Sequence, residues 1–392
     1  MLLLSVIGCG QQAVPYPHGA EPIGSVRAMY DGALPPDLAV NTFRNIDRLF
    51  PTRLIAHAVH PRSLPPATRP LNDVHFSDRG KSYDLEHYMT LNRVAGLLVL
   101  DHGQVALERY RLGNSPRTRW MSMSLAKSIT STMIGAALRQ GAISGLSDSV
   151  THYVPALRGS AYEGVSIRDV LQMASGVRWN ETYTDPASDR RHLLEAQIAQ
   201  VPGSALAVMR ALPRAHPPGT VFNYNTGETQ VAAEVLRHAV GVPLADYLED
   251  RIWSRYGMEA DAYWWLDSPR GVEIGGSGIS ATLRDYGRFG LFLLDGGVAA
   301  GDSILPAGWI HEATTPKVLR GGTPLPYGYL WWTGADNTFA GEGIYGQFLY
   351  VNPAAGIVIV VLSARSSPAD PGVIDDWRFF EAVTDAQTRL ER

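Results

Sequence analysis

The feature that most constrains this fold is the order of hydrophobic patterns along the chain. Residues 94–100 are almost all apolar, and an Asp-His-Gly turn separates them from an imperfectly alternating run at 104–112, which predicts a β-hairpin. A second hairpin pattern lies near the other end, where residues 347–352 and 357–363 flank Pro-Ala-Ala-Gly. Residues 146–257 have mostly helical spacing, broken by loops rich in Pro and Gly.

This order predicts an α+β fold, with an antiparallel sheet flanked by helices and a mostly helical domain inserted into it. Residues 91–125 and 270–392 would form the sheet domain, and residues 126–269 the helical domain, with the active site between the two. Residues 10–90 are rich in Pro and loop formers, which indicates an extended N-terminal segment wrapped on the main body. The last apolar pattern, at about 373–390, predicts an amphipathic helix.

Residues 1–9 end in Val-Ile-Gly-Cys and resemble the end of a bacterial lipoprotein signal, whose cysteine becomes lipid-modified. The charged start of such a signal is missing and the apolar stretch is short, so an irregular start with an incidental cysteine is the other interpretation. Processing would give a periplasmic protein or one with a lipid anchor at Cys9, and the second interpretation a cytoplasmic one. Cys9 is the only cysteine, which excludes an internal disulfide and a Cys-based metal site.

Composition excludes several classes of function. A net charge of −4 without a cluster of Lys and Arg gives no surface for nucleic acid. The sequence contains no run of about 18 apolar residues, so it predicts no transmembrane helix. The 11 His are scattered without the spacing of metal ligands. The sequence also lacks the Gly-x-Ser-x-Gly motif that is typical of an α/β-hydrolase. We therefore expect neither a metal nor an organic cofactor.

A Ser-x-x-Lys motif, Ser124-Leu125-Ala126-Lys127, stands where a helical pattern begins that stops at Gly141. Positions i and i+3 of a helix share a face, so the hydroxyl and the amine can meet. A serine hydroxyl is a poor nucleophile until a neighbouring base removes its proton, and a lysine whose pKa is lowered by burial can be that base. We therefore predict Ser124 as a nucleophile and Lys127 as its base.

The rarity of lysine strengthens this prediction. Lys81, Lys127 and Lys317 are the only lysines among 34 Lys and Arg residues. Arginine, which the chain uses otherwise, cannot act as a base near neutral pH. A lysine inside an apolar helical pattern therefore favours a chemical role over the alternative, an exposed lysine at the start of a helix.

A second motif lies about a hundred residues further on, in Pro-Gly-Thr-Val-Phe-Asn-Tyr-Asn-Thr at 218–226. Alone, Tyr224 could equally be a core aromatic residue. Together with Ser-x-x-Lys, the stretch resembles the second motif of the class C β-lactamase and penicillin-binding-protein superfamily, in which Tyr-x-Asn or Tyr-x-Ser follows Pro-Gly-x-x-Phe. Thr226 stands in place of that Asn or Ser, a departure that keeps a hydroxyl and leaves its hydrogen-bond partners open.

The resemblance extends from about residue 90 to the end and implies a β-lactamase/transpeptidase-like fold. Residues 167–176 and 275–282 resemble structural blocks of the superfamily. The Lys-Thr-Gly motif of β-lactamases corresponds best to Gly-Glu-Gly at 341–343, on a predicted strand. Gly343 fits the close backbone approach that is needed beside the nucleophile. Gly341 stands in the Lys position, and because that lysine helps hold the carboxylate of a β-lactam, efficient β-lactam hydrolysis is not expected.

Within the superfamily, the chain most resembles the branch of 6-aminohexanoate-dimer hydrolases, with the family VIII carboxylesterases nearby. Residues 179–188 are similar to the loop of that branch whose Tyr closes over an amide substrate, and residues 331–334 and 343–347 resemble it too. The resemblance implies that Tyr183 and Trp332 contact substrate, together with Gly343. Ordinary aromatic packing is the alternative for Tyr183 and Trp332.

The resemblance also implies that the backbone N–H groups of Ser124 and Ile344 form the oxyanion hole and that Tyr224 relays protons. We expect a serine hydrolase that cleaves a small amide or ester through an acyl-enzyme. Carboxylesterase, D-aminopeptidase and weak β-lactamase activities are alternatives, and so is an inactive sensor domain with the penicillin-binding architecture. The oligomeric state stays open, with a homodimer as one option.

Overall fold

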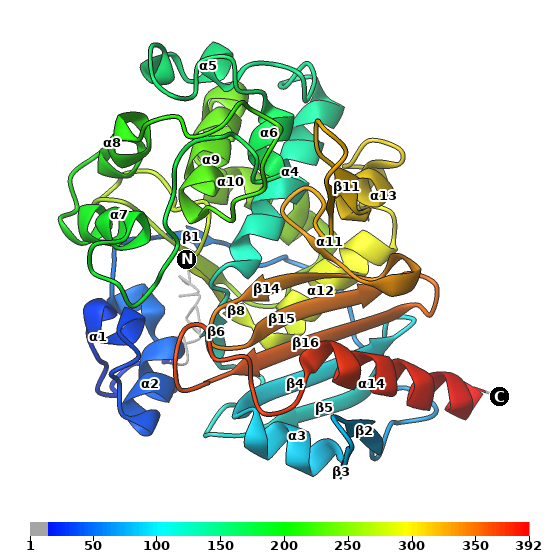
Figure 1. The fold of residues 1–392 in the computed structure, drawn as a ribbon. Coiled ribbons are helices and arrows are strands. Elements are labelled where there is room, and N and C mark those ends of the chain that lie inside the picture. The colour runs from blue at the N-terminus through cyan, green and yellow to red at the C-terminus, as the bar shows by residue number, and fades with distance from the viewer. Residues whose placement is uncertain (1–14, 392) are drawn as a thin grey trace, which may run out of the picture.

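A computed structural model describes residues 15–391 and has the predicted α+β architecture. Its central element is a six-stranded antiparallel sheet with the strand order β13-β14-β15-β16-β4-β5 (Figure 1). The strands are β13 (Trp332–Thr333), β14 (Phe339–Gly343), β15 (Gln347–Asn352), β16 (Ile357–Ser363), β4 (Val94–Asp101) and β5 (Gln104–Tyr110). Strand β16 pairs with β4, so the sheet joins the two ends of the chain.

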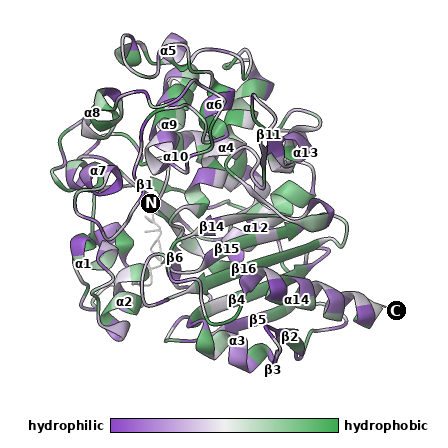
Figure 2. Cartoon of the chain, in the orientation of Figure 1, coloured by the Kyte–Doolittle hydropathy of each residue, from purple (hydrophilic) through white to green (hydrophobic). Residues whose placement is uncertain are grey.

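The middle strands are apolar on both faces because helices cover both. In β16, Ile357, Ile359 and Val361 belong to a core with α3 (Leu85–Leu91) and α14 (Asp376–Glu391). The alternating residues Val358 and Val360 face the other core, which includes α12 (Leu283–Leu294). Figure 2 shows this hydrophobic character along the middle of the sheet. Continuous burial explains why these strands read as apolar runs without strict alternation.

A second, four-stranded antiparallel sheet leads to the site. Its order is β1-β7-β8-β6, and its strands are β1 (Thr52–Ile55), β7 (Ala262–Trp265), β8 (Ile279–Thr282) and β6 (Arg119–Met121). Three two-stranded ribbons complete the β structure: β2 (Phe76–Asp78) with β3 (Lys81–Tyr83), β9 (Val298–Ala299) with β10 (Asp302–Ser303), and β11 (Lys317–Val318) with β12 (Pro324–Leu325).

Helices fill the middle of the chain. Two long ones, α4 (Leu125–Gln140) and α9 (Thr226–Val240), pack against each other. The helix predicted to stop at Gly141 does so, with Gly141 left-handed at a φ of 78°. The other helices are α5 (Val150–Tyr153), α6 (Ile167–Leu171), α7 (Asp189–Ile198), α8 (Ser204–Ala211), α10 (Leu244–Leu248), α11 (Ser254–Tyr256) and α13 (Trp309–Thr314).

The segment before β4 contains short helices that its sequence pattern did not indicate. Besides α3, these are α1 (Val26–Tyr30) and α2 (Pro36–Phe43). Its loop-forming residues begin helices: the Ser25 hydroxyl caps α1, and Pro35 and Pro36 start α2. Figure 1 places α1 and α2 at the side of the molecule, below α7. The predicted lipid-modified Cys9 lies outside the described residues.

Over residues 15–391, no helix combines the length and the apolar character that crossing a bilayer requires.

Candidate active site

Ser124 lies at the start of α4, directly after a strained turn. The preceding strand is fixed by a hydrogen bond from Ser122 N to Ile279 O of 2.7 Å. Met123 then takes a φ of +41°, which is uncommon for a residue with a side chain, and Ser124 is the N-cap residue of the helix. Such strain persists only where the surroundings hold it, and Met123 is buried in the core. The turn therefore presents Ser124 at a fixed position, with 9% of the residue exposed.

Lys127 stands one helical turn further on and is buried beside the serine. Its Nζ donates hydrogen bonds to Ser124 Oγ, at 2.7 Å, and to the carbonyl of Gly276, at 3.0 Å. Burial lowers the pKa of Lys127 to about 7, against the opposing charge of Glu181. The neutral form of Lys127 is therefore accessible near pH 7, and a neutral amine can accept the proton of the serine.

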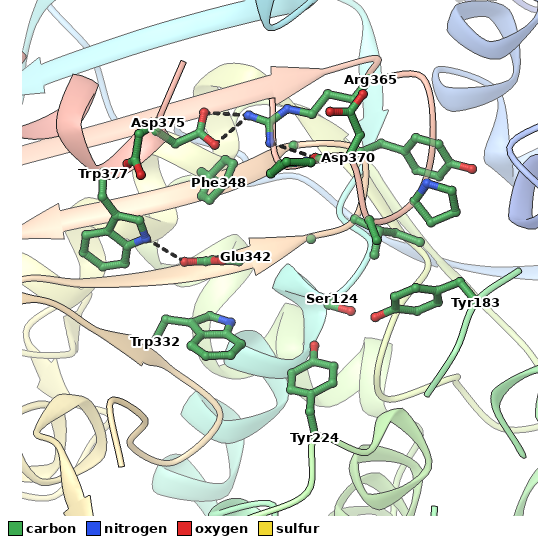
Figure 3. Close-up of a pocket in the computed structure, with 18 of the residues that line it drawn as sticks. Ser124, Tyr183, Tyr224, Trp332, Glu342, Phe348, Arg365, Asp370, Asp375 and Trp377 are labelled. Carbon is green, nitrogen blue, oxygen red and sulfur yellow. Dashed lines mark hydrogen bonds and ion pairs between the residues drawn. The ribbon is translucent and has the colours of Figure 1, made fainter. Parts of the chain in front are cut away.

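Tyr224 precedes α9, whose N-cap residue Asn225 accepts a hydrogen bond from Glu228 N. The tyrosine hydroxyl points at Ser124 (Figure 3), and Lys127 Nζ lies 5.2 Å from the ring centroid. Burial raises the pKa of Tyr224 above its ordinary value, and the negative charge of Glu181 adds to this. The phenol therefore keeps its proton at neutral pH and can donate it.

Glu181 was not singled out from the sequence, yet it organises this side of the site. It accepts hydrogen bonds from Thr226 N, at 2.9 Å, and from the hydroxyl of Thr226. It also accepts one from the indole of Trp179, and Arg190 Nε lies 3.9 Å from its Oε1. Thr226, which departs from the Asn or Ser of the motif, therefore finds its hydrogen-bond partner in Glu181 of the loop at 179–188.

Apart from Lys127, which is buried beside Ser124, the candidate residues line one cavity of about 400 Å³. Ser124 and Tyr224 lie at its floor, and Tyr183 and Trp332 face them from opposite sides (Figure 3). The ring of Trp332 stacks on that of Tyr224, with 5.9 Å between the centroids. The side chains of Tyr183 and Trp332 are only partly buried, as a contact with substrate requires. Gly343 and Ile344 also line the cavity.

Strand β14 passes so close to the nucleophile that its glycines are required. A Cβ on Gly343 would lie 2.5 Å from Ser122 O, and one on Gly341 would lie 2.9 Å from Ser128 Oγ. The approach of Gly343 brings the chain at Ile344 beside Ser124. A side chain at Gly341 would press on the Ser128 hydroxyl, which donates a hydrogen bond to Leu330 O, so the missing lysine fits the close packing of this strand on α4.

The two structural blocks noted in the sequence, at 167–176 and 275–282, support the elements that carry the site. Ser175 donates a hydrogen bond to the buried Glu228 of α9, and the backbone of Gly176, with a φ of +78°, contacts His216 O too closely for a Cβ. Gly276 is the residue that sequence reasoning undervalued, because its carbonyl accepts a hydrogen bond from Lys127. The Gly-rich run at 275–278 was the only signal, and it indicated close packing rather than a role in the site.

Comparison with known sequences shows the family of this chain. The sequence model of the family named Beta-lactamase matches residues 85–384, so the chain belongs to this family. It is a serine hydrolase. Over 301 residues, 73% of this chain and 76% of the relative, it is 33% identical to the 6-aminohexanoate-dimer hydrolase of Paenarthrobacter ureafaciens.

Solved structures share the fold. A structure named as a 6-aminohexanoate-dimer hydrolase from Bacillus anthracis aligns with a TM-score of 0.77 at 24% identity, over 89% of this chain and 92% of its own. A family VIII carboxylesterase aligns with a TM-score of 0.57 at 17% identity, over 76% and 92%. A class C β-lactamase aligns with a TM-score of 0.56 at 18% identity, over 79% and 94%. The β-lactamase/transpeptidase-like fold follows from these alignments.

Proposed function

We propose that this protein hydrolyses amide or ester bonds of small substrates through an acyl-enzyme on Ser124, with short linear amides such as 6-aminohexanoate dimer as its substrate class. The observation that carries the proposal is the buried hydrogen bond between Lys127 Nζ and Ser124 Oγ, at a lysine whose pKa lies at about 7. A base with a pKa near the working pH is best placed to remove a proton and return it.

In the first step, neutral Lys127 accepts the proton of Ser124 as Oγ attacks the carbonyl carbon of the substrate. The carbonyl oxygen becomes an oxyanion. The N–H groups of Ser124 and Ile344 stabilise it, because both residues line the cavity at the point of attack. Lys127, now an ammonium ion, stays hydrogen-bonded to Gly276 O.

In the second half of this step, the C–N or C–O bond breaks and the leaving group takes a proton. Tyr224 supplies it, since its raised pKa keeps the phenol protonated and its hydroxyl lies beside Ser124. Lys127 then restores the proton of Tyr224. Water attacks the acyl-enzyme by the same route in reverse, which releases the acid and restores Ser124.

Two observations favour a linear amide or ester over a β-lactam. Gly341 leaves the substrate carboxylate of a β-lactam without the lysine that holds it in β-lactamases, and a Cβ at this position would already lie 2.9 Å from Ser128 Oγ. The 33% identical relative is named for a linear amide substrate. Esters of family VIII type are the second candidate, since the same acyl-enzyme forms from them more easily.

The test is turnover of p-nitrophenyl butyrate, 6-aminohexanoate dimer and nitrocefin by the wild type and two matched variants. We expect turnover of the ester and the dimer and very little of nitrocefin. Ser124→Ala should abolish it, whereas Ser131→Ala, a buried serine on the same helix, should retain it. Full ester hydrolysis by Ser124→Ala would refute the proposal, and preferred turnover of nitrocefin would refute the substrate class.

A further inference from the structure

The short helix α1 precedes residues 85–384, the part of the chain that the family model matches. It packs against α7 through three side-chain contacts. Arg27 makes two hydrogen bonds to Glu195, of 2.8 and 2.6 Å. Arg190 donates to the hydroxyl of Tyr30 and lies over its ring. Arg191 Nη1 donates to Asp31 Oδ1 at 2.5 Å.

The contact of Arg191 continues into the substrate cavity. Its Nη1 also donates to the backbone carbonyl of Tyr183, at 3.2 Å. The side chain of Tyr183 lines the cavity and faces Ser124 from the side opposite Trp332 (Figure 3). One guanidinium therefore joins Asp31 to the backbone of the residue that faces the nucleophile.

The same end of α1 also contacts a second segment that lines the cavity. The hydroxyl of Tyr345 donates to the carbonyl of Met29, and Tyr345 follows the proposed oxyanion residue Ile344. Tyr345 has a φ of +67°, and its ring packs 4.8 Å from that of Phe43 in α2. Residues 29–31 thus contact the turn at 343–346 directly and the loop of Tyr183 through Arg191.

The burial of Arg191 distinguishes its contact with Asp31 from an ordinary ion pair at the surface. Arg191 is only 4% exposed, whereas the Asp31 side chain is 44% exposed. Removing Asp31 would leave a buried guanidinium without its carboxylate, and such a group is costly to leave unpaired. We expect Arg191 to move toward water and to release the carbonyl of Tyr183.

We infer that Asp31 is a positioning residue for the substrate cavity: through Arg191 it fixes the Tyr183 loop, and it thereby sets the affinity for substrates that depend on Tyr183 for binding. The inference rests on the proposed function, since it takes Tyr183 to contact substrate. It makes the N-terminal segment, which lies outside the family match, a part of the substrate site.

The kinetic test compares Asp31→Ala with Arg27→Ala, which removes an exposed ion pair between the same two helices. Asp31→Ala should raise KM for 6-aminohexanoate dimer about tenfold and leave kcat/KM for p-nitrophenyl acetate within about twofold, because this small activated ester needs little binding energy from the Tyr183 loop. Arg27→Ala should leave both substrates unchanged. Asp31→Asn keeps an oxygen acceptor for Arg191, and we expect an intermediate KM.

A second readout does not depend on activity. Hydrogen exchange of backbone amides at 180–188 should be about tenfold faster in Asp31→Ala than in Arg27→Ala or the wild type. Equal exchange in the two variants, or equal changes in KM, would overturn the inference. A wild type that cleaves neither substrate would refute the proposed function instead, and the exchange rates would still decide whether Asp31 fixes the loop.

Discussion

The cavity has two walls that are held in place in different ways. The helical wall consists of Ser124 and Tyr224, at the starts of α4 and α9, together with Lys127 buried beside Ser124. The loop wall consists of Tyr183 with its loop and the turn at 343–346. Side chains of α4 and α9 lie in the core, and Lys127 is 1% exposed. The loop wall is fixed by polar contacts with α1, one of which ends in the half-exposed carboxylate of Asp31.

This difference separates two tasks. Close packing fixes the atoms that move protons in the proposed mechanism, because a change of a few tenths of an ångström there disturbs many neighbours. Polar contacts of loops can adjust, which suits the recognition of a substrate. Changes in the helical wall should therefore lower kcat for every substrate, and changes in the loop wall should depend on the substrate or be smaller.

The largest effect is expected from Lys127→Arg. The variant keeps a positive charge but has no basic lone pair at neutral pH, so kcat/KM for both ester and amide should fall about 10³-fold. Lys317→Arg, at a partly exposed lysine of β11, is the matched control and should keep full activity. Steady-state kinetics with p-nitrophenyl butyrate measures the two variants. An active Lys127→Arg would mean that another group is the base.

Tyr224→Phe should follow, with an effect that depends on the leaving group. An amine must be protonated to leave, whereas p-nitrophenolate leaves as an anion. We therefore expect kcat for the amide to fall about a hundredfold and kcat for the ester to fall much less. Equal losses for both substrates would contradict a role of Tyr224 in protonating the leaving group.

The pH profile tests the helical wall without a substitution. The pKa of Lys127 is lowered to about 7, so the neutral, active form predominates above that pH and is lost as the pH falls below it. Measured with p-nitrophenyl acetate, kcat/KM should decrease about thirtyfold from pH 8 to pH 5.5. A flat profile over this range would show that Lys127 does not accept the proton.

The smallest effect concerns the loop wall. Tyr345→Phe removes the hydroxyl that donates to Met29 O but keeps the ring, so the turn that carries Ile344 should loosen slightly. We expect kcat/KM to fall about fivefold for ester and amide alike, since both form an oxyanion. Tyr350→Phe, in the core beside α14, should change neither and serves as the control. A larger loss than in Tyr224→Phe would contradict the division into two walls.

Local patterns in the sequence were sufficient for much of this description. The second hairpin was predicted with the bounds that β15 and β16 have, while the earlier strand predicted to reach residue 112 ends at Tyr110. The predicted helix at 373–390 begins at Asp376. The pairing of Ser124 with Lys127 needed only helical periodicity, because three residues along a helix return to the same face.

The sequence by itself thus determined most of the strands, the long helices and a candidate nucleophile with a candidate base on one helical face. Only the tertiary structure decided what surrounds them: Gly276 beside Lys127, Glu181 beneath Thr226, and Asp31 behind Tyr183. The physical reason is separation along the chain. Periodicity reports neighbours within a turn or a strand. In contrast, Lys127 and Gly276 are 149 residues apart, Glu181 and Thr226 are 45 apart, and Asp31 and Arg191 are 160 apart. These partners meet only when the whole core has formed.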